Sequence, residues 1–233
     1  MTLFKGWHHY WGWYCKWRPG HHHHGHDHGH CPPTGPVPCF TPGTMILTEK
    51  GERPVENLRE GDRIATRDNG FQTLRWVGQR DLDAQDLAQN AALRPITIRK
   101  DAFGAGCPER DMHVSPQHRI LLRGAELSIL FQQDEIFAPA GSLRGRRGVC
   151  ASQLSQVRYL HLLFDRHEVI LSDGLWTESF QPGEAVLGAM DQAAKAEIHA
   201  LFPTLTQTPL ALSYPAARST LKRHEIALLA HTS

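Results

Sequence analysis

The chain has 233 residues, of which 40% are hydrophobic and 21% are charged. This composition supplies enough apolar surface for a folded core and excludes a chain that is disordered throughout. The formal net charge of +1 gives no electrostatic reason to expect binding to nucleic acid or to an anionic membrane, and no apolar run reaches the roughly 18 residues of a membrane span.

The first 38 residues differ in composition from the rest of the chain. Four of the six tryptophans lie there, and a proline-rich run over 32–38 leads into the remainder. We predict that residues 1–38 form an extended or disordered arm without a core of its own. The arm has neither a continuous aliphatic stretch nor a small-residue cleavage site, so no conventional signal peptide is expected. Localisation stays open between the cytoplasm and non-classical secretion.

A histidine block lies inside this arm. Its members are His21, His22, His23, His24, His26, His28 and His30. Imidazole is a good ligand for Zn²⁺, Ni²⁺ and Cu²⁺, so we expect the block to bind such an ion. The alternative interpretation is a tag or a neutral low-complexity spacer.

Residues 39–180 have the pattern of short strands separated by turns. The predicted strands cover 45–48, 63–66, 73–78, 95–99, 119–122, 159–164 and 168–171. Between two of them, Asp68-Asn69-Gly70 is a typical hairpin signal. Many short strands with close turns predict a compact all-β fold.

The pattern becomes helical after Phe180. Residues 191–201 are rich in Ala, Lys and Glu and predict a helix that ends before Pro203, and apolar spacing over 216–230 predicts a second one. We therefore divide the chain into an arm (1–38), a β-domain (39–180) and a short helical extension (181–233), which packs on the β-domain or forms an interface.

Cys39 lies directly after the proline-rich run and directly before the β-domain. A thiol there can attack the carbonyl carbon of Pro38 and convert the peptide bond to a thioester. A histidine near the amide nitrogen can supply the proton that the leaving group needs, and a hydroxyl can hold the oxyanion. Ser115 and His118 provide both groups three positions apart. Taken alone, a cysteine before Phe40 is more typical of an ordinary buried thiol.

Three separated motifs resemble the Hint (Hedgehog/intein) domain family. The run Cys39-Phe40-Thr41-Pro42-Gly43-Thr44, with segments 51–55 and 58–62, resembles the first block of these domains. Ser115-Pro116-Gln117-His118 resembles their Thr-x-x-His signature, with Ser in place of Thr. Residues 165–179 resemble the closing strands, and the run from Tyr159 to Glu168 is similar to that of bacterial Hint proteins. Three motifs in the right order are a specific signal. The resemblance covers roughly residues 39–180, and we expect it to extend to the helical tail as well.

The resemblance implies a compact, horseshoe-like β fold and a site made of particular residues. Cys39 matches the nucleophile, His118 the histidine that activates the scissile amide, and Ser115 the hydroxyl beside it. His167 matches the histidine of the closing segment, with Asp165 as its neighbour. No cofactor is required for this chemistry.

The sequence also departs from the family pattern. Glu178 and Ser179 stand where inteins have His-Asn, and Gln79 stands where Hedgehog domains have an activating aspartate. These changes argue against both splicing and sterol transfer. His161 lies where inteins often carry an aspartate, and we expect a structural role for it. Pro38 is a slow acyl donor, so slow cleavage is expected.

The sequence-based hypothesis is therefore a single-turnover, autocatalytic cleavage. An N–S acyl shift at Pro38–Cys39 gives a thioester, and water or an external nucleophile then releases the chain's own arm, which is the substrate. Two alternatives stay open. One is a non-catalytic Hint scaffold that presents the metal-binding arm, and the other is a cysteine hydrolase that acts on other molecules.

Overall fold

Strands dominate the computed structural model, which describes residues 37–188, 190–203, 205 and 214–229. The predicted arm, apart from Val37 and Pro38, and the whole histidine block lie outside the described residues. The strands are β1 (Met45–Thr48), β2 (Gly51–Pro54), β3 (Arg63–Thr66), β4 (Gly70–Thr73), β5 (Trp76–Leu82), β6 (Ile96–Ile98), β7 (Met112–Val114), β8 (Arg119–Arg123), β9 (Glu135–Pro139), β10 (Val149–Ala151), β11 (Val157–Leu163), β12 (Val169–Ser172) and β13 (Leu175–Glu178). The all-β expectation is confirmed, and the predicted strands at 45–48 and 63–66 match β1 and β3 residue for residue.

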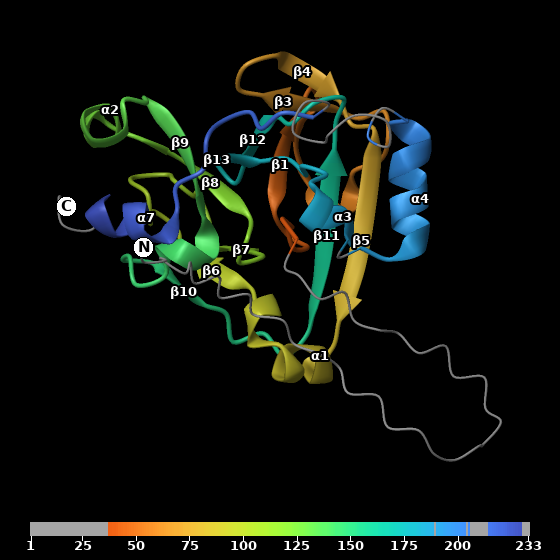
Figure 1. Cartoon of the computed structure of the whole chain (residues 1–233), viewed down its shortest axis with the longest axis horizontal. Coiled ribbons are helices and arrows are strands. Elements are labelled where there is room, and N and C mark those ends of the chain that lie inside the picture. The colour runs from red at the N-terminus through yellow and green to blue at the C-terminus, as the bar shows by residue number, and fades with distance from the viewer. Residues whose placement is uncertain (1–36, 189, 204, 206–213, 230–233) are drawn as a thin grey trace, which may run out of the picture. The chain divides into compact units, whose positions relative to one another are not determined.

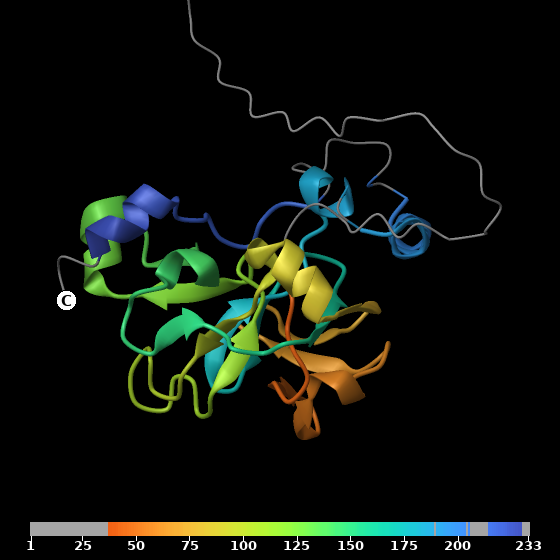
Figure 2. The ribbon, with the colours of Figure 1, turned by 90° about the horizontal axis from the view of Figure 1, so that it is seen from below.

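The larger sheet brings together the two ends of the β-domain. Its strand order is β2-β1-β3-β12-β13-β8-β9, and β4 pairs with β3. The closing hairpin of β12 and β13 therefore lies between β3 and β8 (Figures 1 and 2). The predicted strand at 73–78 is in fact interrupted, because Leu74 hydrogen-bonds through its backbone to Gly61 and Asp62 before β5 begins.

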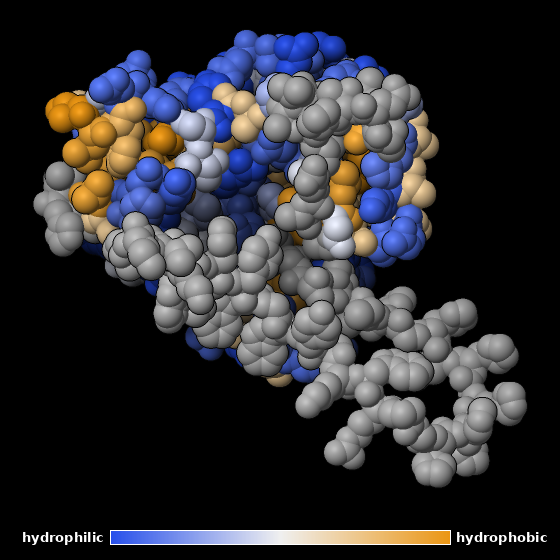
Figure 3. All heavy atoms as spheres, in the orientation of Figure 1, coloured by the Kyte–Doolittle hydropathy of each residue, from blue (hydrophilic) through white to orange (hydrophobic). Residues whose placement is uncertain are grey.

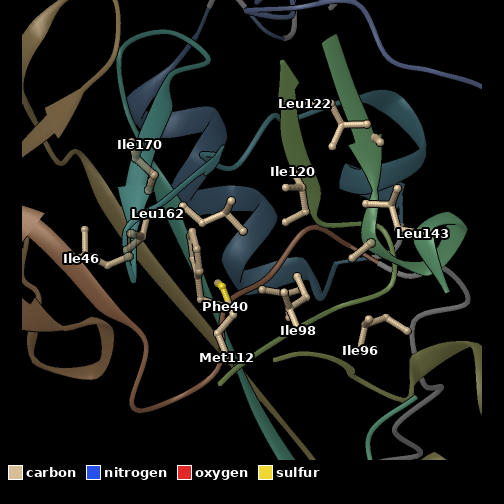
Figure 4. Packing of buried hydrophobic residues seen from close by; sticks show 14 of the residues in the cluster. Phe40, Ile46, Ile96, Ile98, Met112, Ile120, Leu122, Leu143, Leu162 and Ile170 are labelled. Carbon is tan, nitrogen blue, oxygen red and sulfur yellow. The ribbon is translucent and has the colours of Figure 1, made fainter. Parts of the chain in front are cut away.

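Phe40 joins the remaining strands. Strands β10, β6 and β7 form one ladder, and β11 and β5 form another. Phe40 lies between them, because it forms antiparallel bridges to Val114 of β7 and to Leu160 of β11. Its N–H and C=O both pair with Leu160 at 2.9 Å. Figure 4 shows the Phe40 ring among Leu162, Met112 and other core side chains. The residue that follows Cys39 is thus fixed at the centre of the fold.

The described helices are short and mostly peripheral. They are α1 (Ala84–Gln89), α2 (Ala125–Phe131), α3 (Glu184–Gly188), α4 (Gln192–Leu201) and α7 (Arg223–Leu229). Helices α2 and α7 carry exposed apolar side chains, among them Ile129, Leu130 and Leu228. Figure 3 shows apolar surface at the left of the view, on the side where Figure 1 places these two helices. None of the helices within the described ranges has the length and apolar character that a membrane crossing demands.

Helix α4 confirms the predicted helix at 191–201, with the Asp191 carboxylate accepting a hydrogen bond from the Ala194 N–H as its N-cap. The second predicted helix was wrong in its first turns, because α7 begins only at Arg223. The preceding segment pairs with the exposed edge of β9 instead: Phe137 donates its N–H to the Ser219 carbonyl and accepts from Leu221. Backbone pairing with a sheet edge outweighed the helical spacing of the apolar residues.

Asp173 and Gly174 form the tight turn between β12 and β13, with φ values of 48° and 74°. Asp-Gly is a preferred pair for a hairpin turn in which both residues have positive φ. The Asp173 carboxylate is buried, accepts from the Met45 N–H at 3.2 Å and lies 3.2 Å from Arg110. Burial nevertheless raises the pKa of this carboxyl to about 6, and the two favourable contacts do not offset it.

We expect Asp173→Asn to stabilise the fold at pH 8 by on the order of 1 kcal/mol, because asparagine tolerates positive φ and brings no charge into the interior. The raised pKa means that the folded state binds the Asp173 proton more tightly than the unfolded state. The protonated Asp173 carboxyl therefore makes its full contribution to the free energy of unfolding at low pH. This contribution is lost as the pH rises through about 6. Urea unfolding at pH 5 and pH 8 measures this, and an advantage of Asp173→Asn that is larger at pH 5 would contradict it.

Candidate functional site

Both ends of the Pro38–Cys39 peptide bond are held by side chains. The Cys39 N–H donates to the Ser115 hydroxyl oxygen at 2.9 Å, and the Pro38 carbonyl oxygen lies 2.9 Å from His161 Nδ1. The Ser115 hydroxyl in turn donates to the Val37 carbonyl at 2.7 Å. Ser115 follows β7 directly, and its own N–H donates to the Cys39 carbonyl at 3.0 Å. The Pro38–Cys39 amide is therefore contacted by side chains at both its nitrogen and its oxygen.

The protonation state of His161 follows from its partners. A carbonyl oxygen only accepts hydrogen bonds, so the Nδ1 atom that contacts the Pro38 oxygen carries the proton. Burial lowers the pKa of His161 to about 4, so the ring is neutral at pH 7 and its Nε2 holds a free lone pair. That Nε2 atom lies 3.9 Å from the Cys39 sulfur. The imidazole is thus arranged to accept a thiol proton on one side and to polarise the Pro38 carbonyl on the other.

The Cys39 thiol is buried and hydrogen-bonded to a backbone carbonyl. Cys39 is 3% exposed, and its Sγ donates to the Val37 carbonyl at 2.9 Å. Burial raises the pKa of the Cys39 thiol well above its ordinary value, although the Ser115 hydrogen bond and the charge of Arg80 act in the opposite direction. A free thiolate is therefore not populated at neutral pH, and any attack by Cys39 needs a base that removes the proton during the step.

Arg80 brings a positive charge to this region. It lies opposite Tyr159 in the β5–β11 ladder, two residues along from Gly78, which lies opposite His161. Because side chains alternate along a strand, Arg80 shares a face with the site residues. Burial lowers its pKa. Among the described residues no carboxylate lies within ion-pair distance of Arg80, so its charge is available to stabilise negative charge at the site.

His118 lies close to Ser115, but its ring makes no polar contact with the Pro38–Cys39 amide. Its backbone N–H donates to the Ser115 carbonyl at 3.1 Å, and its ring meets Phe40 edge-on with 4.4 Å between the centroids. Both ring nitrogens are buried without a hydrogen-bond partner among the described residues. Burial lowers the pKa of His118 to about 4, partly opposed by Glu178. At rest His118 is a neutral ring beside the site.

His167 belongs to a separate buried cluster with Glu178 and Arg119. Its Nε2 lies 3.2 Å from the Glu178 carboxylate, and its Nδ1 accepts from the Ala217 N–H at 3.1 Å. The Arg119 guanidinium lies 2.6 Å from the same carboxylate. Burial pushes the pKa of Glu178 upward, but His167 and Arg119 outweigh it and the net shift is downward. The structure therefore places His167 with Glu178 rather than with Cys39.

Asp165 is on the surface. Its carboxylate forms a bidentate ion pair with Arg75, with Nε–O distances of 2.9 and 3.0 Å. Of the five residues predicted from sequence, the structure thus gathers Cys39 and Ser115 into direct contact, keeps His118 adjacent to them, and puts His167 and Asp165 elsewhere.

The residue that sequence reasoning left out of the site is His161, whose ring the structure places against both the Pro38 carbonyl and the Cys39 sulfur. From the sequence, a structural role was expected for it. The only signal in the sequence was that it replaces the aspartate common in inteins. Its position depends on the pairing of Leu160 with Phe40, a contact 120 positions apart in the chain that no local pattern reveals.

Comparisons with known proteins agree with the motifs. A model of the Hint domain family matches residues 38–184, which begins one residue before Cys39. A solution structure of a bacterial intein-like domain from Clostridium thermocellum is similar at 15% identity and a TM-score of 0.39, covering 61% of this chain and 97% of that one. Variant M86 of the Ssp DnaB mini-intein is similar at 10% identity and a TM-score of 0.38, covering 62% and 95%. No curated protein matches.

Proposed function

The chain belongs to the Hint domain family of self-processing domains, and on this premise we propose that it cleaves its own backbone between Pro38 and Cys39 without splicing. The observation that carries the proposal is that side chains contact both the nitrogen and the oxygen of this one amide. Ser115 accepts from its nitrogen, His161 contacts its oxygen, and the thiol of Cys39 lies beside the same imidazole.

The proposed first step is an N–S acyl shift. The sulfur of Cys39 attacks the Pro38 carbonyl carbon while its proton passes to Nε2 of His161. The resulting imidazolium and its Nδ1–H stabilise the oxyanion. As the C–N bond breaks, the proton moves from His161 to the departing nitrogen, which leaves a thioester between Pro38 and Cys39 and a free α-amino group on Cys39. His118, the proton donor predicted from the sequence, lies next to Ser115 and is the second candidate for this last transfer.

Release follows when a nucleophile attacks the thioester. Water gives a carboxylate on Pro38, and an amine or thiol gives the corresponding amide or thioester; the Cys39 thiol is the leaving group in each case. The products are residues 1–38 and 39–233.

The absence of splicing is supported by the closing hairpin. Splicing in inteins ends with cyclisation of an asparagine, and the corresponding residue here is Ser179. Its hydroxyl accepts from the Glu168 N–H and its own N–H donates to the Glu168 carbonyl, both at 2.9 Å. Glu178 is held in the buried cluster with Arg119 and His167. Neither side chain can perform the cyclisation, since neither carries an amide.

The nucleophile dependence of cleavage tests this proposal. The purified chain is incubated at pH 8 with and without a small thiol, and the products are followed by mass spectrometry. A thioester intermediate predicts that cleavage accelerates with thiol concentration and that the thiol appears on the 1–38 product. Cleavage that is insensitive to thiol, or a product mass equal to direct hydrolysis at every thiol concentration, would point to a different chemistry.

A second function is favoured by one observation, the seven histidines within ten positions of the arm. We propose that this block binds Zn²⁺, Ni²⁺ or Cu²⁺ through imidazole. Titration of the full chain with Zn²⁺ is expected to show micromolar or tighter binding that disappears when all seven histidines are replaced by serine. Equal binding by the serine variant would refute it, and zinc binding by a chain that never cleaves would favour the non-catalytic scaffold.

A further inference from the structure

The imidazole of His161 is bounded by two aromatic rings. The Trp76 ring is nearly parallel to it, with an angle of 12° and 6.3 Å between centroids. The Phe180 ring meets it edge-on at 5.2 Å. Both rings lie at distances typical of aromatic pairs. Close packing of such neighbours opposes rotation of the imidazole about its bond to Cβ and favours the orientation in which it meets both Pro38 and Cys39.

Gly78 allows Trp76 to take this position. Trp76 and Gly78 point to the same face of β5, and Gly78 lies opposite His161 in the ladder with β11. A Cβ at position 78 would overlap the six-membered ring of Trp76. The indole of Trp76 therefore lies across the backbone of Gly78, on the side of His161. Any larger residue at position 78 would displace the indole.

Helix α4 holds the far end of the same indole. Trp76 Nε1–H donates to the Glu197 carboxylate at 2.7 Å. Figure 1 shows α4 alongside β5, and Ile198 of this helix packs in the apolar cluster that also contains Trp76 and Cys39. The helix lies beyond residue 184, where the match to the Hint family ends.

We propose that Trp76, fixed by Glu197 of helix α4, is a positioning residue for His161, and that this part of the helical extension thereby completes the cleavage site. The indole keeps the imidazole oriented so that Nδ1 meets the Pro38 oxygen and Nε2 faces the Cys39 sulfur. The catalytic consequence rests on the proposed function, whereas the orientation of His161 does not.

The orientation is tested by NMR on the full chain carrying Cys39→Ala, which cannot form the thioester. With this background alone, the His161 ring is expected to be neutral and protonated at Nδ1 from pH 5 to pH 8. Adding Glu197→Leu removes the acceptor of the indole N–H and is expected to raise the pKa of His161 by about one unit or more towards its ordinary value, because water reaches the ring. Glu197→Gln keeps an oxygen acceptor and is expected to restore most of the original behaviour.

The matched control is Gln192→Leu, another exposed position of α4, in its first turn. An unchanged His161 tautomer and pKa in Glu197→Leu would overturn the proposal, as would the same change in Gln192→Leu. Because Glu197 is exposed, its replacement leaves the core intact, and Trp76→Phe gives a second variant that keeps a ring but loses the N–H donor.

Cleavage is measured separately in the chain that retains Cys39. Glu197→Leu is expected to slow it about 10-fold to 100-fold, the size of effect that a small misplacement of a reacting group produces. If the original chain does not cleave but His161 responds as described, the proposed function fails and the positioning role stands. If the original chain cleaves and Glu197→Leu alters neither the rate nor His161, the positioning role fails alone.

Discussion

Replacing Cys39 with alanine is expected to abolish cleavage at Pro38–Cys39 completely. The thiol is the group that forms the new bond to the Pro38 carbonyl carbon, and alanine has no atom that can replace it. The substitution removes one sulfur from a site that already holds the scissile amide through Ser115 and His161, so the fold is expected to persist. The measurement is the intact mass of the purified chain over several days at pH 8.

Cys107→Ala is the matched control. Cys107 is partly buried and its sulfur lies 3.6 Å from the Gly174 carbonyl, which belongs to the turn after β12. This variant loses a thiol that lies outside the site and is expected to cleave at the original rate. Cleavage by Cys39→Ala, or loss of cleavage in Cys107→Ala with its fold retained, would contradict the assignment of the nucleophile.

Replacing His161 with glutamine is expected to slow cleavage by about 100-fold to 10,000-fold, which is the range for removal of a general base. Glutamine can still donate an N–H to the Pro38 oxygen, but it offers no basic nitrogen to the Cys39 thiol. Burial raises the pKa of that thiol, so the thiolate is not populated and the reaction cannot proceed through it without a base. The rate is measured by mass spectrometry under conditions where the original chain cleaves.

The matching variant is His118→Gln, which tests the assignment made from the sequence. Both imidazoles have a pKa lowered to about 4 by burial, so both are neutral bases above pH 5. Of the two imidazoles, only that of His161 contacts the Pro38–Cys39 amide in the structure. A larger loss in His161→Gln than in His118→Gln supports the contact geometry, and the reverse order would return the principal role to His118.

The sequence predicted those parts of the site that are close together along the chain. Cys39, the proposed nucleophile, follows a proline-rich run and opens a recognisable block, and Ser115 lies three residues before His118 in a second one. Both signals are local, and the structure brings Cys39 and Ser115 into hydrogen-bond contact. The strands that flank these blocks were predictable for the same reason, because alternation of apolar side chains is itself a local pattern.

What escaped prediction depends on contacts between distant segments. His161 reaches the Pro38–Cys39 bond because Leu160 pairs with Phe40. Asp165 was grouped with the site because it adjoins the closing motif, yet its carboxylate pairs with Arg75 on the surface. The segment before α7 has helical spacing but pairs with β9, since an exposed sheet edge offers it backbone partners. Tertiary contacts determine the position of each of these residues and segments. The periodicity of apolar residues along the chain carries no information about such contacts.

The most direct test of the account is the intact mass of the 26.2 kDa chain after incubation with hydroxylamine at pH 8. Hydroxylamine attacks thioesters far faster than amides. The account predicts two products, residues 1–38 ending in a hydroxamate on Pro38, and residues 39–233 beginning with a free Cys39. An intact chain under all of these conditions, including raised pH and long incubation, would contradict it, and so would a cut at any other peptide bond.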